Sequence, residues 1–191
     1  MHYQKRRLFI GIHLSPFLRK KLAQEVAAWG KEVLIPTREE NFHISLHHLG
    51  FVLEDQIPAL CIKLQDAVAN IEAFDVTFTG MEVRESLENP KMISLTGEPS
   101  VPLKLLYEEI EKALGMFMAE RKSFRPQVAM AQIKKAKWLT RQTAGEPLPN
   151  VKENFRANDP VESITLFETT VRDGKKLHDP LATASFGQQY E

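Results

Sequence analysis

A histidine and a serine two positions apart, His43 and Ser45, are the residues of this sequence whose types and spacing best suit acid–base chemistry. They lie in the segment 41–46, which reads Asn-Phe-His-Ile-Ser-Leu. Successive side chains of a β-strand alternate between its two faces, so His43 and Ser45 share one face and the three apolar residues share the other. An imidazole exchanges a proton near neutral pH, and a hydroxyl donates a hydrogen bond to a nearby oxyanion. The segment predicts a half-buried strand that presents both groups side by side.

A later segment, 124–130, has a similar shape and different chemistry. It reads Phe-Arg-Pro-Gln-Val-Ala-Met. Val128 and Met130 take the core-facing positions of a strand, which leaves Gln127 and Ala129 as the outward pair. The two segments therefore predict similar strands, of which only the first carries an imidazole and a hydroxyl.

The order of these motifs along the chain resembles that of the 2H phosphoesterases, and among them the 2′-5′ RNA ligases and RNA 2′,3′-cyclic phosphodiesterases. The likeness covers nearly the whole chain: 7–12 as an opening strand, 43–46 followed by 49–52, 124–126 before the second motif, and 164–168, Gly174 and 181–187 in a last hairpin. The resemblance implies an α+β fold with two pseudo-symmetric lobes of antiparallel sheet, helices packed outside and a central groove. Members of this family face two His-x-Thr/Ser motifs across that groove.

The same resemblance implies a chemistry, which is that of an RNA 2′,3′-cyclic phosphodiesterase or 2′-5′ RNA ligase-like hydrolase of the 2H type. Its imidazoles would move protons at the attacking and leaving oxygens, and its hydroxyls would bind the non-bridging phosphate oxygens, without a metal or cofactor. His43 and Ser45 carry over as the catalytic pair. Gln127, Arg125 and Lys134 are expected to contact the substrate, an RNA end or nucleotide with a 2′,3′-cyclic or 2′-5′ phosphodiester.

The second motif departs from the family pattern. Gln127, Ala129 and Gln132 stand where the family would have His, Thr and a nearby Arg. An amide cannot exchange a proton at accessible pH, although it can still donate hydrogen bonds. Losing one acid–base partner reduces a rate by about 10²–10⁴. Three hypotheses remain: an impaired phosphodiesterase, a catalytically inactive protein that binds a nucleotide or RNA end in the same groove, or an enzyme that acts on another phosphoester with one essential histidine.

Other histidines are candidates for the missing imidazole. By strand alternation His47 shares the face of His43, but four residues span roughly 13 Å, too far for both to reach one phosphate. The same alternation predicts that His48 faces the core. His13, at the end of the first strand, and His178, in the predicted loop of the last hairpin, could reach the groove through folding. The sequence leaves open which of them does so.

The composition is that of an ordinary soluble domain, with 43% hydrophobic and 26% charged residues. Lys plus Arg and Asp plus Glu both number 25, so no net charge attracts the chain to polyanions. The stretch 121–141 nevertheless lacks acids and contains Arg121, Lys122, Arg125, Lys134, Lys135, Lys137 and Arg141. This stretch is either a solvated strand end or a phosphate-facing rim. Its aromatic residues, Phe124 and Trp138, either stack on a base or pack in the interior.

Cys61 is the only cysteine, so the chain cannot form an internal disulfide. It falls in an apolar helical stripe, which favours a buried inert thiol. The basic residues 5–7 precede an apolar run that is too short for a signal peptide, and no segment approaches the roughly 18 apolar residues of a membrane helix. We expect a cytosolic monomer without membrane contact.

The elements expected to position the motifs alternate between strands and helices. Ser15 with Pro16 begins a helix that Gly30 ends, apolar residues from Ile57 to Val68 define a second helix, and Ser100 with Pro102 begins a third. Strands are expected near 74–78, 92–95, 161–171 and 181–187, with a loop at 143–150. Residues 1–191 are expected to form a single domain of two closely packed lobes.

Overall fold

The computed structural model describes residues 4–86, 88–115 and 124–187, and all elements named here lie in these ranges. The helices are α1 (Pro16–Ala28), α2 (Ile57–Val68), α3 (Val101–Ala113) and α4 (Lys135–Thr143), with two 3-10 helices, η1 (Glu39–Asn41) and η2 (Glu54–Gln56). The strands are β1 (Lys5–His13), β2 (Leu34–Pro36), β3 (His43–Leu53), β4 (Phe74–Glu85), β5 (Pro90–Gly97), β6 (Gln127–Ile133), β7 (Ala157–Val161), β8 (Ser163–Arg172) and β9 (Lys175–Ser185).

Two of the helices begin at caps that the sequence predicts. The N–H of Leu18 donates a hydrogen bond to Oγ of Ser15 at the start of α1, and the N–H of Leu103 does the same with Ser100 at the start of α3. A proline follows each cap within the first two helical positions, where its missing N–H has no intrahelical partner to lose. Local capping therefore fixes where each of these helices leaves the sheet.

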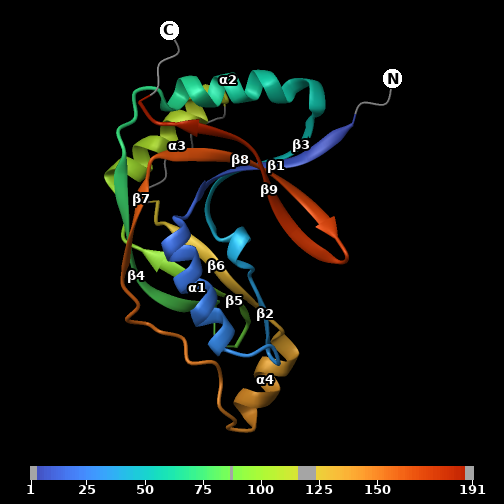
Figure 1. Ribbon diagram of the computed structural model, residues 1–191. Helices are drawn as coiled ribbons and strands as arrows, with labels where there is room; N and C mark the ends of the chain where they lie inside the picture. Colours follow the sequence, from blue (N-terminus) through green and yellow to red (C-terminus); the bar gives the residue numbers. More distant parts are fainter. Residues whose placement is uncertain (1–3, 87, 116–123, 188–191) are drawn as a thin grey trace.

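Nine strands of the described residues form one antiparallel sheet in the order β7-β4-β5-β6-β3-β1-β8-β9, with β2 beside β6. The two motif strands, β3 and β6, meet at its centre, where Ile44 pairs with Val128. Four strands of this order lie on each side of the junction, and the helices lie outside the curled sheet (Figure 1). The predicted α+β fold with two similar halves of antiparallel sheet is confirmed.

One face of the sheet is covered by helices. In Figure 1, α2 and α3 lie side by side across one end of the molecule, and α1 lies beside β6. Their inward side chains are fully or almost fully buried, which favours folding by about 1.5–3 kcal/mol for each large aliphatic group. These side chains are Leu18, Leu22 and Val26 of α1, Leu64 and Val68 of α2, and Leu103, Leu106 and Ile110 of α3. The helices thereby fix one face of the sheet and leave the other for His43.

Two strands and one α-helix, namely β2, β7 and α4, were not expected from the sequence, and neither were the 3-10 helices η1 and η2. No side chain caps the N-terminus of α4, where Lys134 is the N-cap residue, and Pro160 interrupts the strand pattern of β7, which lies at an edge of the sheet. The last hairpin is also longer than predicted, because β9 begins at Lys175 rather than near 181.

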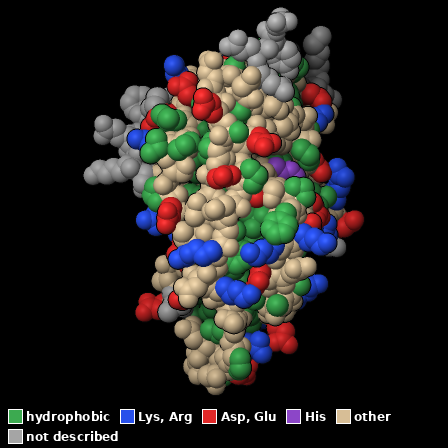
Figure 2. Space-filling model, turned by 60° about the vertical axis from the view of Figure 1, so that its left-hand side comes forward, with side chains coloured by type: hydrophobic (Ala, Val, Ile, Leu, Met, Phe, Trp, Pro, Cys, Tyr) green, Lys and Arg blue, Asp and Glu red, His purple; other side chains and the backbone are tan. Residues whose placement is uncertain are grey.

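Charged side chains of both signs cover the face shown in Figure 2, with Lys and Arg gathered in a band across its middle and most acids above them. This mixed distribution agrees with the equal numbers of acidic and basic residues in the sequence. Among the residues that the structure describes, no helix is both long and apolar enough to span a membrane.

Candidate functional site

His43 and Ser45 form a hydrogen-bonded pair at the start of β3. Nδ1 of His43 lies 2.7 Å from the backbone oxygen of Asn41, and Nε2 lies 3.0 Å from Oγ of Ser45. A carbonyl oxygen only accepts, so Nδ1 carries the proton of the neutral ring and Nε2 accepts from the Ser45 hydroxyl. The strand therefore presents an imidazole in the tautomer that a general base requires.

Gly11 of β1 makes room for this ring. A Cβ atom at Gly11 would lie 2.7 Å from the backbone oxygen of Ile44 and 3.3 Å from Cδ2 of His43. The first distance is shorter than a normal contact and involves backbone, which cannot move aside as a flexible side chain could. A glycine at this position thus allows β1 and the His43 ring to approach closely.

Burial controls the charge of His43. The pKa of the ring is lowered to about 4, mainly because burial removes it from water and in smaller part because of the nearby His178, His13 and His48, while the Asn41 carbonyl opposes this shift. The free site therefore holds His43 neutral at physiological pH, with Nε2 free of a proton.

Two phenylalanines form the floor on which the histidines lie. Phe9 and Phe167 are buried and stacked, with ring centroids 4.9 Å apart. The centroid of His43 lies 4.7 Å from that of Phe9, and the centroid of His178 lies 4.9 Å from it. His43 and His178 themselves meet edge to face at 5.1 Å. The prediction that His178 lies in a loop was wrong, since it belongs to β9, and it reaches His43.

Asn41 links β9 to the His43 strand. Its Nδ2 donates to the backbone oxygen of Lys176, and its Oδ1 accepts from the N–H of His178, both at 3.1 Å. These backbone groups belong to β9, the last strand in the sheet order, and are those that a further strand would bind. The side chain of Asn41 is buried, so one residue satisfies the edge of β9 and orients His43 through its own carbonyl.

The predicted directions of His47 and His48 were wrong. His47 is buried and stacks on Tyr107 of α3 with centroids 4.0 Å apart, whereas His48 is exposed and lies 5.8 Å from Phe9. The cause is a register shift, because Gly11 pairs with Ser45 whereas Ile10 pairs with His47. The extra residue between them is a β-bulge, which reverses the alternation of the strand beyond it.

His13 lies directly opposite His43 in the pairing of β1 with β3. Burial and the neighbouring Arg19 guanidinium lower its pKa. Its Nε2 is buried and has no hydrogen-bond partner among the described residues. The groove side of the sheet thus holds His13, His43, His48 and His178. No three His, Cys, Asp or Glu side chains of the described part of the chain converge as a metal site requires.

The second motif lies beside the first. Since Ile44 pairs with Val128, the residues on either side of this pair, including Ser45 and Gln127, face the same space. Nε2 of Gln127 donates to Oγ of the buried Ser94 at 3.0 Å, and Ala129 is exposed. The predicted neighbourhood of the two segments is found, with an amide and a methyl group in the second.

The basic stretch extends away from His43. Arg125 is exposed two residues before Gln127. Lys134 follows seven residues after Gln127, roughly 23 Å along a strand, and its Nζ donates to the backbone oxygen of Lys31 at 2.7 Å. Arg141 forms ion pairs with Glu32 and Glu146. Arg121 and Lys122 lie outside the described residues. The structure thus brings Arg125 near the motif strand's start and leaves Lys134 at its far end.

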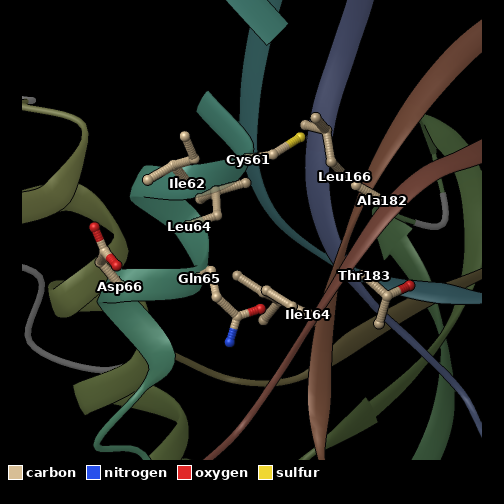
Figure 3. A pocket seen from close by; sticks show the side chains of 10 residues that line it. Cys61, Ile62, Leu64, Gln65, Asp66, Ile164, Leu166, Ala182 and Thr183 are labelled. Atoms are coloured by element: carbon tan, nitrogen blue, oxygen red, sulfur yellow. The ribbon is translucent and has the colours of Figure 1, made fainter. Parts of the chain in front are cut away.

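Two other residues of interest serve packing. Trp138 is 2% exposed, which places its ring in the interior rather than on a ligand. Cys61 lines a cavity of about 270 Å³ between α2 and the β8–β9 hairpin (Figure 3), and burial raises the pKa of its thiol. Ile164 and Leu166 line the same cavity from β8. They face away from Phe167 along that strand, so the cavity is separate from the His43 groove.

The sequence is similar to those of known proteins. A model of the 2′-5′ RNA ligase superfamily matches residues 19–172. An RNA 2′,3′-cyclic phosphodiesterase of Thermotoga maritima is 28% identical over 132 residues, which cover 67% of this chain and 70% of that protein.

Solved structures share the fold. TT0787 of Thermus thermophilus superposes with a TM-score of 0.72 at 19% identity and covers 96% of this chain and 100% of its own. LigT of E. coli, solved with 3′-AMP, superposes with a TM-score of 0.72 at 21% identity and covers 97% and 100%. The same protein has also been solved with NADP+.

Proposed function

Because the chain belongs to the 2′-5′ RNA ligase superfamily of 2H phosphoesterases, we propose that it is an RNA 2′,3′-cyclic phosphodiesterase with a weakened second motif. The observation that carries the proposal is the pair of His43 and Ser45, in which a neutral imidazole accepts from a hydroxyl at 3.0 Å. The relative from Thermotoga maritima bears the name of this activity. LigT, with the same fold, has been solved with two nucleotides, which supports an RNA end or nucleotide as the ligand.

His43 is the proton-transfer group in this proposal. A water molecule attacks the phosphorus of the cyclic phosphate and its proton moves to Nε2 of His43, while the bond from phosphorus to one ribose oxygen breaks. A second water molecule protonates the ribose oxygen that leaves, and His43 afterwards returns its proton to solvent. Proton transfer of this kind contributes about 10²–10⁴ to a rate. The Ser45 hydroxyl turns from Nε2 to a non-bridging phosphate oxygen, where its hydrogen bond stabilises the developing charge.

Gln127 is a contact that does not titrate. Its amide can donate to a phosphate oxygen in place of Ser94 but cannot protonate the ribose oxygen that leaves. Ala129 offers no hydroxyl, and removal of one such donor lowers a rate by about 10²–10³. Turnover is therefore expected to be slow relative to that of an enzyme with two complete motifs.

The second candidate is a protein that binds a nucleotide or RNA end without cleaving it. The hydrogen bond from Gln127 to Ser94 favours this function. The bond holds the Gln127 amide in place, and the amide does not protonate a leaving oxygen. A monomer without a cofactor suffices for either candidate, since both motif strands come from one chain.

A turnover assay separates the candidates. The purified protein is incubated with each nucleoside 2′,3′-cyclic phosphate, and ring-opened monophosphate is quantified. The phosphodiesterase proposal expects slow product formation that His43→Gln abolishes, with the exposed Lys20→Ala as a variant that leaves it unchanged. Binding of a nucleotide 3′-monophosphate without any turnover would instead support the binding protein, and product formation that survives His43→Gln would contradict the role of His43.

A further inference from the structure

Two cationic side chains and two histidines lie beside His43 and play no part in the chemistry above. Arg7 precedes Phe9 by two residues in β1, so it shares a face with the aromatic floor, and Lys176 precedes His178 by two residues in β9, so it shares a face with His178. The rings of His48 and His178 lie 5.8 Å and 4.9 Å from that of Phe9. We call Arg7, His48, Lys176 and His178 the cation cluster.

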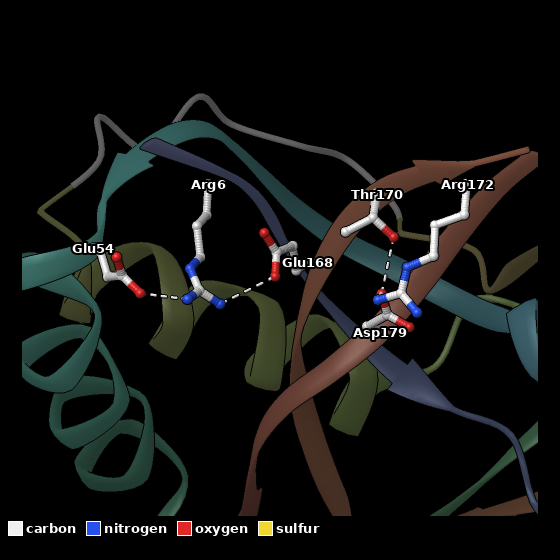
Figure 4. A network of polar contacts seen from close by, with 6 residues as sticks. All are labelled: Arg6, Glu54, Glu168, Thr170, Arg172 and Asp179. Carbon is white, nitrogen blue, oxygen red and sulfur yellow. Dashed lines mark hydrogen bonds and ion pairs between the residues drawn. The ribbon is translucent and has the colours of Figure 1, made fainter. Parts of the chain in front are cut away.

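Three acids of η2, β8 and β9 have other partners (Figure 4). Asp179 accepts from Oγ1 of Thr170 at 2.9 Å and from Nη2 of Arg172 at 3.3 Å. Glu54 and Glu168 both form ion pairs with Arg6.

Arg7 and Lys176 are exposed and form no ion pair with any residue that the structure describes. Their charges are therefore not neutralised by the protein. Burial, Lys176, His48 and Arg7 all lower the pKa of His178, to about 4, and Asp179 opposes this shift only in part. Arg7 and Lys176 thus give the cluster a positive potential that an anion would neutralise.

The cluster adjoins both the reactive pair and an open space. His178 contacts the ring of His43 at 5.1 Å on one side. On the other side His48 lines a cavity of about 650 Å³ whose wall includes Leu60, the cation Lys63 and the acid Asp55. A cavity of this size accommodates a nucleoside. One RNA strand would therefore place one phosphate at His43 and the adjacent phosphate in the cluster. The space beside the cluster would hold the next sugar and base.

We propose that Arg7, His48, Lys176 and His178 form a second phosphate subsite, so that the protein prefers RNA ends of two or more nucleotides to single nucleotides. The inference rests on the proposed function for the phosphate at His43 and adds the phosphodiester linkage next to it. The subsite reads the charge of the backbone rather than the base, since Arg7 and Lys176 are cations.

Binding tests this subsite independently of turnover. Three ligands are titrated by fluorescence anisotropy competition: adenosine 3′-monophosphate, the dinucleotide ApAp, and the same dinucleotide with an uncharged methylphosphonate linkage. ApAp should bind about tenfold more tightly than the uncharged analogue, since two exposed cations contact the linkage. Arg7→Gln and Lys176→Gln should each weaken ApAp about threefold to fivefold and reduce its salt slope by about 0.7, and leave the other two ligands unchanged.

Lys20→Gln, an exposed lysine of α1, is the matched control and should change none of these affinities. Equal affinity for the charged and uncharged linkages would overturn the subsite, as would loss of affinity for adenosine 3′-monophosphate in the Arg7 and Lys176 variants. Absence of any ApAp binding would overturn it too. Slow turnover of a nucleoside cyclic phosphate would still uphold the proposed function in each of these cases, so the two failures are distinguishable.

Discussion

At the scale of single residues, the site depends on how the protein holds His43 neutral. The native pKa of about 4 lies below the ordinary value of 6.5. Between these values the unfolded chain binds a proton at this position and the native protein does not. Protons therefore favour the unfolded state, and the stability that this residue contributes is complete above pH 6.5 and is lost as the pH falls toward 4.

His43→Gln should make stability less dependent on pH in this window. The shift corresponds to about 3 kcal/mol in the free energy of unfolding. In urea unfolding, the unmodified protein should lose stability between pH 7 and pH 4.5. The variant should lose less stability over the same range, by roughly this amount. His48→Gln serves as the control, because the exposed His48 ring is not withdrawn from water. An identical pH dependence in His43→Gln and the unmodified protein would show that the His43 ring is not withdrawn from water as described.

The close approach at Gly11 leads to a second prediction for a single residue. In Gly11→Ala the new Cβ would contact backbone at Ile44 and the ring of His43. We expect a loss of about 1–3 kcal/mol in stability, the usual effect of overpacking, and turnover at least tenfold lower because the imidazole is displaced. Thermal unfolding and the cyclic phosphate assay measure the two effects. Unchanged turnover in a destabilised variant would show that the close approach of Gly11 serves packing alone.

At the scale of elements, Asn41 joins η1, β3 and β9. Asn41→Ala removes both hydrogen bonds to the edge of β9 and should cost about 1–3 kcal/mol, because the partly buried Lys176 carbonyl and His178 N–H lose their partner. Amide hydrogen exchange should accelerate at His178 more than at Phe167 in the middle of β8. Asn89→Ala, in the exposed turn between β4 and β5, is the control. Exchange that accelerates equally over the whole sheet would indicate global destabilisation instead of a local link.

At the scale of the whole molecule, the fold could be predicted from local signals and from the order of the motifs. Ser15 with Pro16, Gly30 and Ser100 specify helix ends by capping and turn chemistry that a few residues contain. The pairing of the two motif segments followed from their shared alternation. These features depend on residues that are neighbours in the sequence, which is why they could be predicted from it.

The arrangement around His43 was harder to predict from the sequence, because it depends on contacts between residues that are far apart in the chain. A bulge in β3 exchanges the directions of His47 and His48, and the sequence of the segment 43–50 does not predict this bulge. His178 meets His43 only because the sheet curls and Asn41 binds β9, 135 residues further on at Lys176. The gathering of four histidines on one side of the sheet is therefore a property of the folded chain.

If the groove is a 2H phosphate site of which one half remains complete, restoration of the other half should restore turnover. Turnover of a nucleoside 2′,3′-cyclic phosphate is compared in the unmodified protein, in Gln127→His with Ala129→Thr, and in that double variant with His43→Ala. We predict that the double variant gains about 10²–10⁴ in turnover, the contribution of a general acid or base, and that His43→Ala abolishes the gain. A double variant no faster than the unmodified protein, or a gain that persists without His43, would show that the groove is not such a site.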